Sequence, residues 1–275
     1  PFMRAPITPC FWFESDSVGA AALYLQAFGG GRIIEATPMS TVWELYGRRL
    51  MGINGGPRYR PNGALSLFVQ RSTEAEVRSA FELLARDGTV HMPLSVKDWS
   101  PLYGWVEDRY GVHWQIAQGR VDAADFTVMP ALTFFGARAG RAREALELYT
   151  GIFSSSSVDE RHIGEDGRLM FAVAHLAGQT LAFMDGPESQ EIPFSEGASL
   201  SVACETQEEI DYFWDALVKG GQESRCGWLV DAFGVSWQIV PAILGELMSN
   251  PERAQRVVAA FLPMNKLDLE TLLNA

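Results

Sequence analysis

An internal repeat is the feature that most constrains how this chain can fold. Residues 105–117 read WVEDRYGVHWQIA, residues 228–240 read WLVDAFGVSWQIV, and seven of the thirteen positions are identical. Average composition would give about one identity by chance. The chain is therefore predicted to be a tandem duplication, so its fold must consist of two similar halves.

The similarity extends upstream through two predicted helices in each half. Thr73 and Thr206 each begin a capping box, with glutamate three residues later. Gly88 and Gly221 stand where a left-handed C-cap is expected at the end of each helix. An earlier helix is indicated by a Leu-Tyr pair with a phenylalanine at identical spacing. These residues are Leu23, Tyr24 and Phe28 in the first half and Leu148, Tyr149 and Phe153 in the second.

Short apolar and β-branched segments between the helices predict strands. In the first half they are 8–13, 32–37, 41–46, 49–53, 65–69 and 112–117. In each half, the order of one strand, one helix and three strands occurs twice in succession. The second half has about ten fewer residues before Trp228, which predicts that one strand there is shortened or absent. Beyond Pro241, helical spacing predicts a tail of three helices at 242–248, 251–262 and 266–273.

The length of 275 residues favours two domains, since a typical domain has about 150 residues. We place the first at 1–120 and the second at 128–275, with the helical tail (242–275) in the second and a connection at about 119–127. The predicted fold class is α+β, made of tandem βαβββ modules.

Composition narrows the classes of partner. The formal net charge of −12 argues against nucleic acid as the main partner. Cys10, Cys204 and Cys226 have no paired spacing, so they predict free thiols in a reducing cytoplasm. The longest apolar runs, such as 257–262, are far shorter than a membrane span, and residues 1–4 do not open a signal peptide. A cationic or neutral small molecule remains open as a partner.

Several motifs together resemble the vicinal oxygen chelate superfamily (glyoxalase, bleomycin resistance and dioxygenase proteins), and within it the PhnB-like branch labelled 3-demethylubiquinone-9 3-methyltransferase. They are Cys204–Glu209, Cys226–Leu229, Phe233–Pro241, Asn250-Pro251 and Lys266–Asp268. The resemblance implies that paired modules form eight-stranded, incompletely closed barrels around a cup-shaped cavity. It therefore implies two cups, or one good pocket beside a degenerate one.

The resemblance also implies where a chelated divalent metal would have its ligands. In the first half these places fall at Cys10, at Gly52 or Asn54, at Ala64 or Ser66, and at Gln115. In the second half they fall at Leu132, at Phe183 or Asp185, at Ser199 and at Gln238. Neither set supplies two imidazoles or carboxylates, so we predict no catalytic metal there, although an irregular set with Asp185 and Gln238 stays open.

No cofactor is predicted either. A nucleotide-binding fold presents its glycine-rich turn between a strand and a helix. The glycines at 29–31 follow a helix, which is typical of a C-cap.

Alternation along a strand puts His113 and Gln115 on one face, with Trp114 on the other. His113 is a candidate general base, as is His91. A hydrogen-bonded structural histidine is the alternative, and Ser236 takes the place of His113 in the second repeat. Asp108 and Asp231 lie in Asp-x-x-Gly turns and are predicted to bond local amides.

Cys10 and Trp12 share a face of the opening strand, where they either line a flat pocket or belong to the core. A buried, inert thiol is the favoured interpretation of Cys10. The candidate ligand-binding residues are Cys10, Trp12, Ser66, Trp99, Tyr103, His113, Gln115, Asp185, Ser199, Ser236 and Gln238.

Three functions remain open at this point. The favoured one is a small-molecule-binding protein that uses a cup-shaped cavity. The second is a vicinal-oxygen-chelate enzyme of lyase, isomerase or dioxygenase type, acting on a small oxygenated or aromatic metabolite. The third is a structural or regulatory partner with degenerate cups. A homodimer formed through the tail is also predicted, since exposed amphipathic helices need a partner surface.

Overall fold

The computed structural model describes residues 6–119 and 128–275. The predicted connection between the halves lies mostly outside these residues, so the division into 1–120 and 128–275 stays a prediction. Among the residues described, no helix is both long and apolar enough to cross a membrane.

Four βαβββ modules follow one another, as the repeat predicted. Module 1 contains β1 (Ile7–Phe13), α1 (Ser17–Phe28), β2 (Gly31–Ala36), β3 (Ser40–Leu45) and β4 (Arg48–Asn54). Module 2 contains β5 (Leu65–Arg71), α2 (Glu74–Ala85), β6 (Thr89–Lys97), β7 (Ser100–Glu107) and β8 (His113–Gln118). Module 3 contains β9 (Val128–Phe134), α4 (Ala142–Ile152), β10 (Ser157–Ile163), β11 (Leu169–Leu176) and β12 (Gln179–Asp185). Module 4 contains β13 (Ala198–Cys204), α5 (Gln207–Val218), β14 (Gln222–Glu223), β15 (Trp228–Val230) and β16 (Ser236–Pro241).

The strands form two eight-stranded sheets, and each sheet takes four strands from each half of the chain. Sheet A has the order β14-β15-β16-β13-β1-β4-β3-β2, so it joins modules 1 and 4. Sheet B has the order β10-β11-β12-β9-β5-β8-β7-β6 and joins modules 2 and 3. The two halves meet where β1 pairs antiparallel with β13 and where β5 pairs antiparallel with β9. The predicted grouping of Cys10 with Gln115 in one cup is therefore wrong, because β1 and β8 lie in different sheets.

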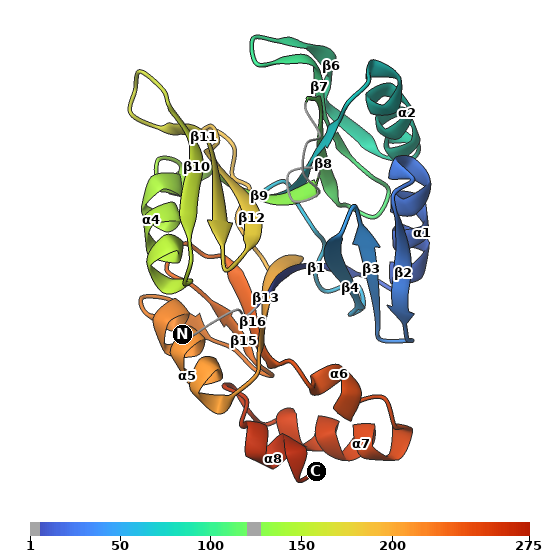
Figure 1. The fold of residues 1–275 in the computed structure, drawn as a ribbon, viewed down its shortest axis with the longest axis vertical. Helices are drawn as coiled ribbons and strands as arrows, with labels where there is room; N and C mark the ends of the chain where they lie inside the picture. The colour runs from blue at the N-terminus through green and yellow to red at the C-terminus, as the bar shows by residue number, and fades with distance from the viewer. Residues whose placement is uncertain (1–5, 120–127) are drawn as a thin grey trace.

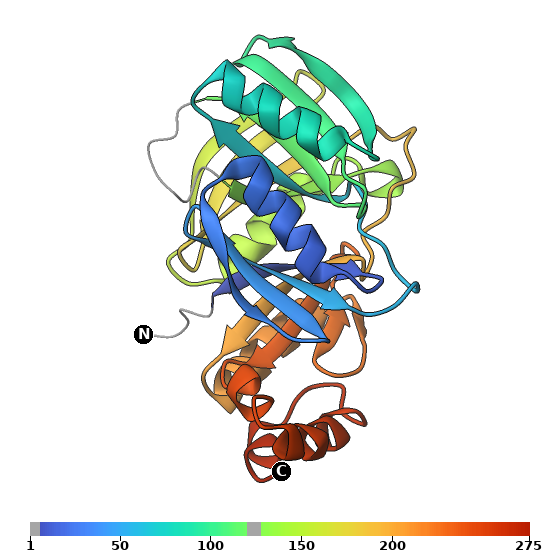
Figure 2. The same ribbon diagram turned by 90° about the vertical axis from the view of Figure 1, so that its right-hand side faces the viewer.

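Helices cover one face of each sheet, and there the two modules of one half share a core. In Figure 1, α1 and α2 lie on one side of the strands and α4 and α5 on the other. Figure 2 shows α1 and α2 lying over the strands of the first half. Tyr24 on α1 packs against Trp114 on β8, with ring centroids 4.7 Å apart. Tyr149 on α4 packs in the same way against Trp237 on β16, at 5.2 Å. Both tryptophans are fully buried, which confirms their predicted place in the helix-side core.

The helix ends differ in part from the prediction. The capping box at Thr73 is complete, whereas at Thr206 the Glu209 carboxylate accepts from the Glu205 amide instead of from the cap residue. The predicted left-handed positions at Gly88 and Gly221 are also wrong, since the positive φ falls one residue earlier in both cases. A Cβ at these glycines would lie 2.2 Å from the Glu107 carbonyl oxygen and 2.0 Å from that of Val230. Glycine is needed there because a strand passes close by.

Module 4 and the tail follow the prediction closely. β14 has two residues and β15 three, as the missing ten residues implied. The tail forms α6 (Leu244–Leu247), α7 (Pro251–Phe261) and α8 (Leu269–Leu273), with a small core of its own. It is tied to module 4 because the Cys226 and Gly227 amides donate to the Met264 and Asn265 carbonyls, at 2.7 and 2.8 Å.

Candidate functional site

The predicted site residues separate into two groups on the helix-free faces of the two sheets. We call these faces cup A, around Cys10, Trp12, Ser199, Ser236 and Gln238, and cup B, around Ser66, Tyr103, His113 and Gln115. Cup A belongs to sheet A and cup B to sheet B. Cup A combines predicted residues from both halves, on β1, β13 and β16, which the sequence grouping by half had kept apart, whereas the predicted residues of cup B all come from the first half.

Cup A has a polar floor. Cys10 lies opposite Ser199 in the β1–β13 pairing, and Ser199 lies beside Ser236 in the β13–β16 pairing. The Gln238 amide donates to the Ser199 hydroxyl at 2.9 Å. Burial raises the pKa of the Cys10 thiol to about 12, despite hydrogen bonds from Gln238 and Ser199. The thiol is therefore protonated at neutral pH, as the inert interpretation predicted.

Ser236 adds an unsatisfied group to this floor. Its side chain is 1% exposed, and its hydroxyl oxygen has no hydrogen-bond partner among the residues that the structure describes. A buried hydroxyl without a partner costs free energy, so a polar group arriving from a bound molecule would be favoured here.

Aromatic side chains form the wall above the floor of cup A. Trp12 lies edge-on to Trp228, with ring centroids 6.3 Å apart, and edge-on to Tyr59 at 5.0 Å. The Trp12 indole donates to the Gly56 carbonyl at 2.8 Å, which fixes its orientation. The sequence did not indicate Trp228 or Tyr59 as site residues, although Trp228 is the repeat counterpart of Trp105.

A cavity of about 290 Å³ adjoins Trp12 at the carboxyl end of β1. Trp12, Tyr59 and Tyr110 contribute aromatic surface, and the charged groups around it include Asp16 and Arg60. This volume is near the lower end of the range for small-molecule sites.

Cup B is filled by its own side chains. Gln115 donates to Ser66 at 3.0 Å and accepts from the Tyr103 hydroxyl at 2.7 Å. Around it lies a second apolar core, separate from the helix-side core. Its buried members are Phe68, Tyr103, Ala117, Met129, Ala131, Val173, Ala182 and Met184. Trp99 stands at the end of this cluster, 60% exposed, against Phe68 and Tyr103.

Asp185 belongs to neither cup. One carboxylate oxygen accepts from the Gly140 and Ala142 amides, at 2.8 and 3.1 Å, and the other accepts from the Leu169 amide at 2.9 Å. This carboxylate therefore anchors the beginning of α4. The structure does not bring it together with Gln238, so it does not favour an irregular metal site made of this pair.

The Asp-x-x-Gly turns behave as predicted. Asp108 accepts from the Tyr110 and Val112 amides and from the Trp114 indole. Asp231 accepts from the Phe233 and Val235 amides and from the Trp237 indole. Both carboxylates are buried and hold their turns.

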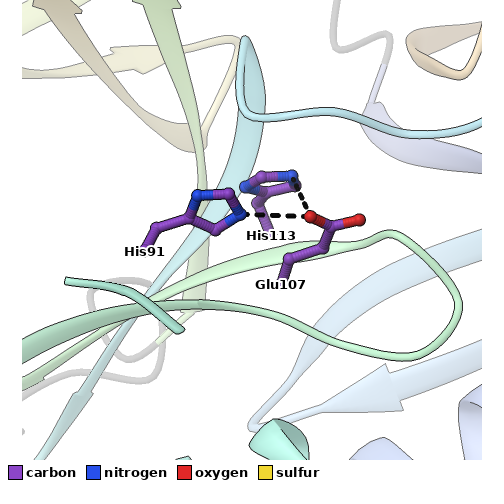
Figure 3. Close-up of side chains that lie close together, drawn as sticks. All are labelled: His91, Glu107 and His113. Carbon is purple, nitrogen blue, oxygen red and sulfur yellow. Dashed lines mark hydrogen bonds and ion pairs between the residues drawn. The ribbon is translucent and has the colours of Figure 1, made fainter. Parts of the chain in front are cut away.

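A cluster of ionisable groups lies at the edge of cup B, where Figure 3 shows His91 and His113 both directed at Glu107. Nε2 of His91 lies 3.1 Å from Oε2 of Glu107, and Nε2 of His113 lies 3.6 Å from the same oxygen. The two imidazoles are stacked, with centroids 4.8 Å apart. Arg60 contacts the other carboxylate oxygen at 3.3 Å.

Strand alternation places His91 on the same face as Glu107. On β6, Thr89 pairs with Glu107 and Val90 with Val106, so the His91 side chain lies on the face of Thr89 and Glu107. The register shifts between Val90 and Met92, so Met92 lies opposite Trp105. Glu107 was not predicted as a site residue, because nothing in its sequence context distinguishes it from a surface glutamate.

Burial lowers the pKa of His113 to about 4, although the Glu107 carboxylate opposes the shift. His113 is therefore neutral at pH 7. Its Nδ1 accepts from the Trp105 indole at 3.1 Å, which places the single imidazole hydrogen on Nε2, toward Glu107. Neither nitrogen is free to accept a proton, so the structure does not favour His113 as a general base.

The superfamily resemblance implies a divalent metal, and the methyltransferase label implies a nucleotide cofactor. The residues at the positions expected to hold them do not fit either group. The chelating positions hold Gln115, Gln238, Cys10 and Ser199, which bond to one another or to neighbouring side chains. Gly29 is the left-handed C-cap of α1, with φ of 75°. The run of three glycines therefore does not form the turn that holds a nucleotide cofactor.

Comparison with known proteins identifies the class of fold to which the chain belongs. The duplicated βαβββ fold is that of the vicinal oxygen chelate superfamily. Glyoxalase I from Zea mays has 12% identity and a TM-score of 0.56, covering 88% of this chain and 96% of its own. A putative dioxygenase from Bacillus subtilis has 11% identity and a TM-score of 0.52, covering 84% and 82%. These likenesses confirm the predicted fold.

Within this class, the chain belongs to the family described as 3-demethylubiquinone-9 3-methyltransferase, which matches residues 5–117 and 127–240. A putative 3-demethylubiquinone-9 3-methyltransferase, a PhnB protein from Bacillus cereus, has 29% identity and a TM-score of 0.38, covering 41% of this chain and 98% of its own. The family match confirms the predicted resemblance to the branch with this label. A search of the curated proteins found no match.

Proposed function

We propose that this protein binds a small molecule in cup A, with a flat apolar part against Trp12 and Trp228 and a polar group toward Ser236. No metal takes part at this site in the proposal. The membership of a superfamily with ligand-binding and enzymatic members supports such a role.

One observation carries the choice of cup. The central apolar side chains of cup B, such as Phe68, Tyr103 and Met184, are buried against one another, whereas those of cup A are only partly buried. The half-buried side chains on the helix-free face of sheet A are Val42, Met51, Ile53, Trp12, Trp228 and Val230. A bound molecule would bury them and so gain the hydrophobic free energy that cup B has already gained internally.

A screen of small aromatic and oxygenated compounds by thermal unfolding tests the proposal. A compound that binds the native protein at a hundred times its dissociation constant should add about 2.7 kcal/mol to the free energy of unfolding. Turnover of the bound compound would make the protein an enzyme, and binding without turnover supports a binding protein.

The replacement Trp12→Ala is expected to weaken binding of such a compound by about 10- to 100-fold, since a buried aromatic contact contributes roughly 1.5 to 3 kcal/mol. Titration calorimetry measures the change. Trp99→Ala is the matched control, because Trp99 is also an accessible tryptophan but lies at cup B. Weakened binding in Trp99→Ala together with unchanged binding in Trp12→Ala would contradict the proposal.

The predicted cytoplasmic location and homodimer stay predictions. Cell fractionation tests the location, and sedimentation equilibrium of the purified chain tests the dimer.

A further inference from the structure

We propose that His91, Glu107 and His113 form a binding site for a first-row transition-metal ion such as Zn²⁺ or Co²⁺. The site lies on sheet B, apart from cup A, so it does not depend on the function proposed above. It also lies outside the chelating positions that the superfamily resemblance implies.

The arrangement of donors is the first argument. Two imidazole nitrogens and one carboxylate oxygen lie within 4.8 Å of one another. Both imidazoles direct Nε2 at the same oxygen of Glu107 (Figure 3). Two imidazoles with one carboxylate match the ligand preference of zinc, cobalt and nickel, whereas magnesium and calcium prefer oxygen ligands alone.

The surroundings support the same ligands. Arg60 engages Oε1 of Glu107, which leaves Oε2 facing the two imidazoles. Such an outer contact orients a carboxylate ligand.

The cluster must close to bind an ion. With bonds of about 2.0 to 2.1 Å, two donor atoms at the tetrahedral angle on one ion are about 3.4 Å apart. The three donors lie within 4.8 Å of one another, so the widest separation must shrink by up to roughly 1.4 Å. His91 is exposed and lies at a bulge on the edge strand β6, where such a movement disturbs few neighbours.

Trp105 competes with the ion for His113. Its indole donates to Nδ1, which keeps the imidazole hydrogen on Nε2, the nitrogen that faces Glu107. When a metal binds Nε2, the imidazole hydrogen must move to Nδ1. Nδ1 can then no longer accept a hydrogen bond from the indole, and two N–H donors face each other. Binding at this site is therefore expected to release the Trp105 indole, and removal of the indole is expected to favour the ion.

The experiment uses the full chain, purified without a histidine tag and freed of metal by a chelator. Calorimetric titration with ZnCl₂ and visible absorption with CoCl₂ are expected to show one equivalent bound at micromolar or lower dissociation constant. His91→Ala, Glu107→Gln and His113→Asn should each weaken binding by at least about 30-fold, because even the loss of an outer partner of a metal ligand weakens binding by about 10- to 100-fold. Circular dichroism checks that each variant is folded.

The chain provides matched controls, because its other two histidines are His162 and His175. His162→Ala and His175→Ala are expected to leave the titration unchanged. Trp105→Phe is expected to tighten binding by about tenfold, the effect of removing one donor conflict. Absence of a one-to-one site below about 100 μM in the unmodified chain would overturn the proposal. So would loss of binding in the His162 or His175 variants alone, and unchanged or weaker binding in Trp105→Phe would overturn the role given to Trp105.

Discussion

Two fragments, residues 6–119 and 128–275, are expected to fold together but not separately. Each fragment alone holds four strands of each sheet, with β1 and β5, or β9 and β13, left as unpaired edges. The pairings lost are β1 with β13 and β5 with β9, each with five residue pairs in register. Unpaired apolar edge strands promote aggregation, so the isolated fragments should be insoluble or unfolded.

Cleavage of the folded chain at a protease site inserted between residues 119 and 128 measures the same property. The two pieces should elute together from a size-exclusion column at the size of the intact chain, and should separate only in denaturant. The intact chain with the inserted site is the control. Two fragments that are each monomeric with a cooperative thermal transition would instead support independent domains at 1–120 and 128–275, as the sequence predicted.

Asp231→Ala is expected to lower the free energy of unfolding by about 4 kcal/mol. Asp231 is buried and accepts from two backbone amides, from the Trp237 indole and from the Tyr149 hydroxyl. Alanine would leave four buried donors without an acceptor, and each unsatisfied group costs about 1 to 3 kcal/mol before relaxation and water entry reduce the total. Urea unfolding monitored by tryptophan fluorescence gives the difference.

Asp98→Ala is the control for this measurement. Asp98 is exposed in the turn between β6 and β7, so its replacement should change the free energy of unfolding by less than about 0.5 kcal/mol. A loss below about 1.5 kcal/mol in Asp231→Ala would show that water replaces the carboxylate in holding the turn.

Local patterns in the sequence were sufficient to predict the elements of this fold. The Trp-Gln-Ile repeat, the capping threonines and the Asp-x-x-Gly turns act over a few residues, and the structure confirms the order of elements that they imply. How the modules combine into sheets could not be predicted in this way. Pairing of β1 with β13 joins residues almost two hundred positions apart, and the strands of all four modules are similar enough to allow pairing within a half.

The candidate site shows the same division. Alternation along β8 correctly placed His113 and Gln115 on one face and Trp114 on the other. It could not indicate that His91, Glu107 and His113 meet, because they lie on three strands whose pairing register the sequence does not specify. The repeat likewise could not distinguish the half-buried wall at Trp12 from the filled cup around Phe68, since side-chain volume on facing strands decides this.

The joining of both cups in a single polypeptide has a consequence for how such a protein can change. When two identical chains form a dimer, a mutation that enlarges one binding surface also enlarges the equivalent surface, because one gene encodes both. Here Phe68 and Met184 can close one surface while Trp12 and Trp228 keep the other accessible, because separate codons specify them. Tandem duplication within one chain thus permits one cup to stabilise the fold while the other cup changes its binding specificity.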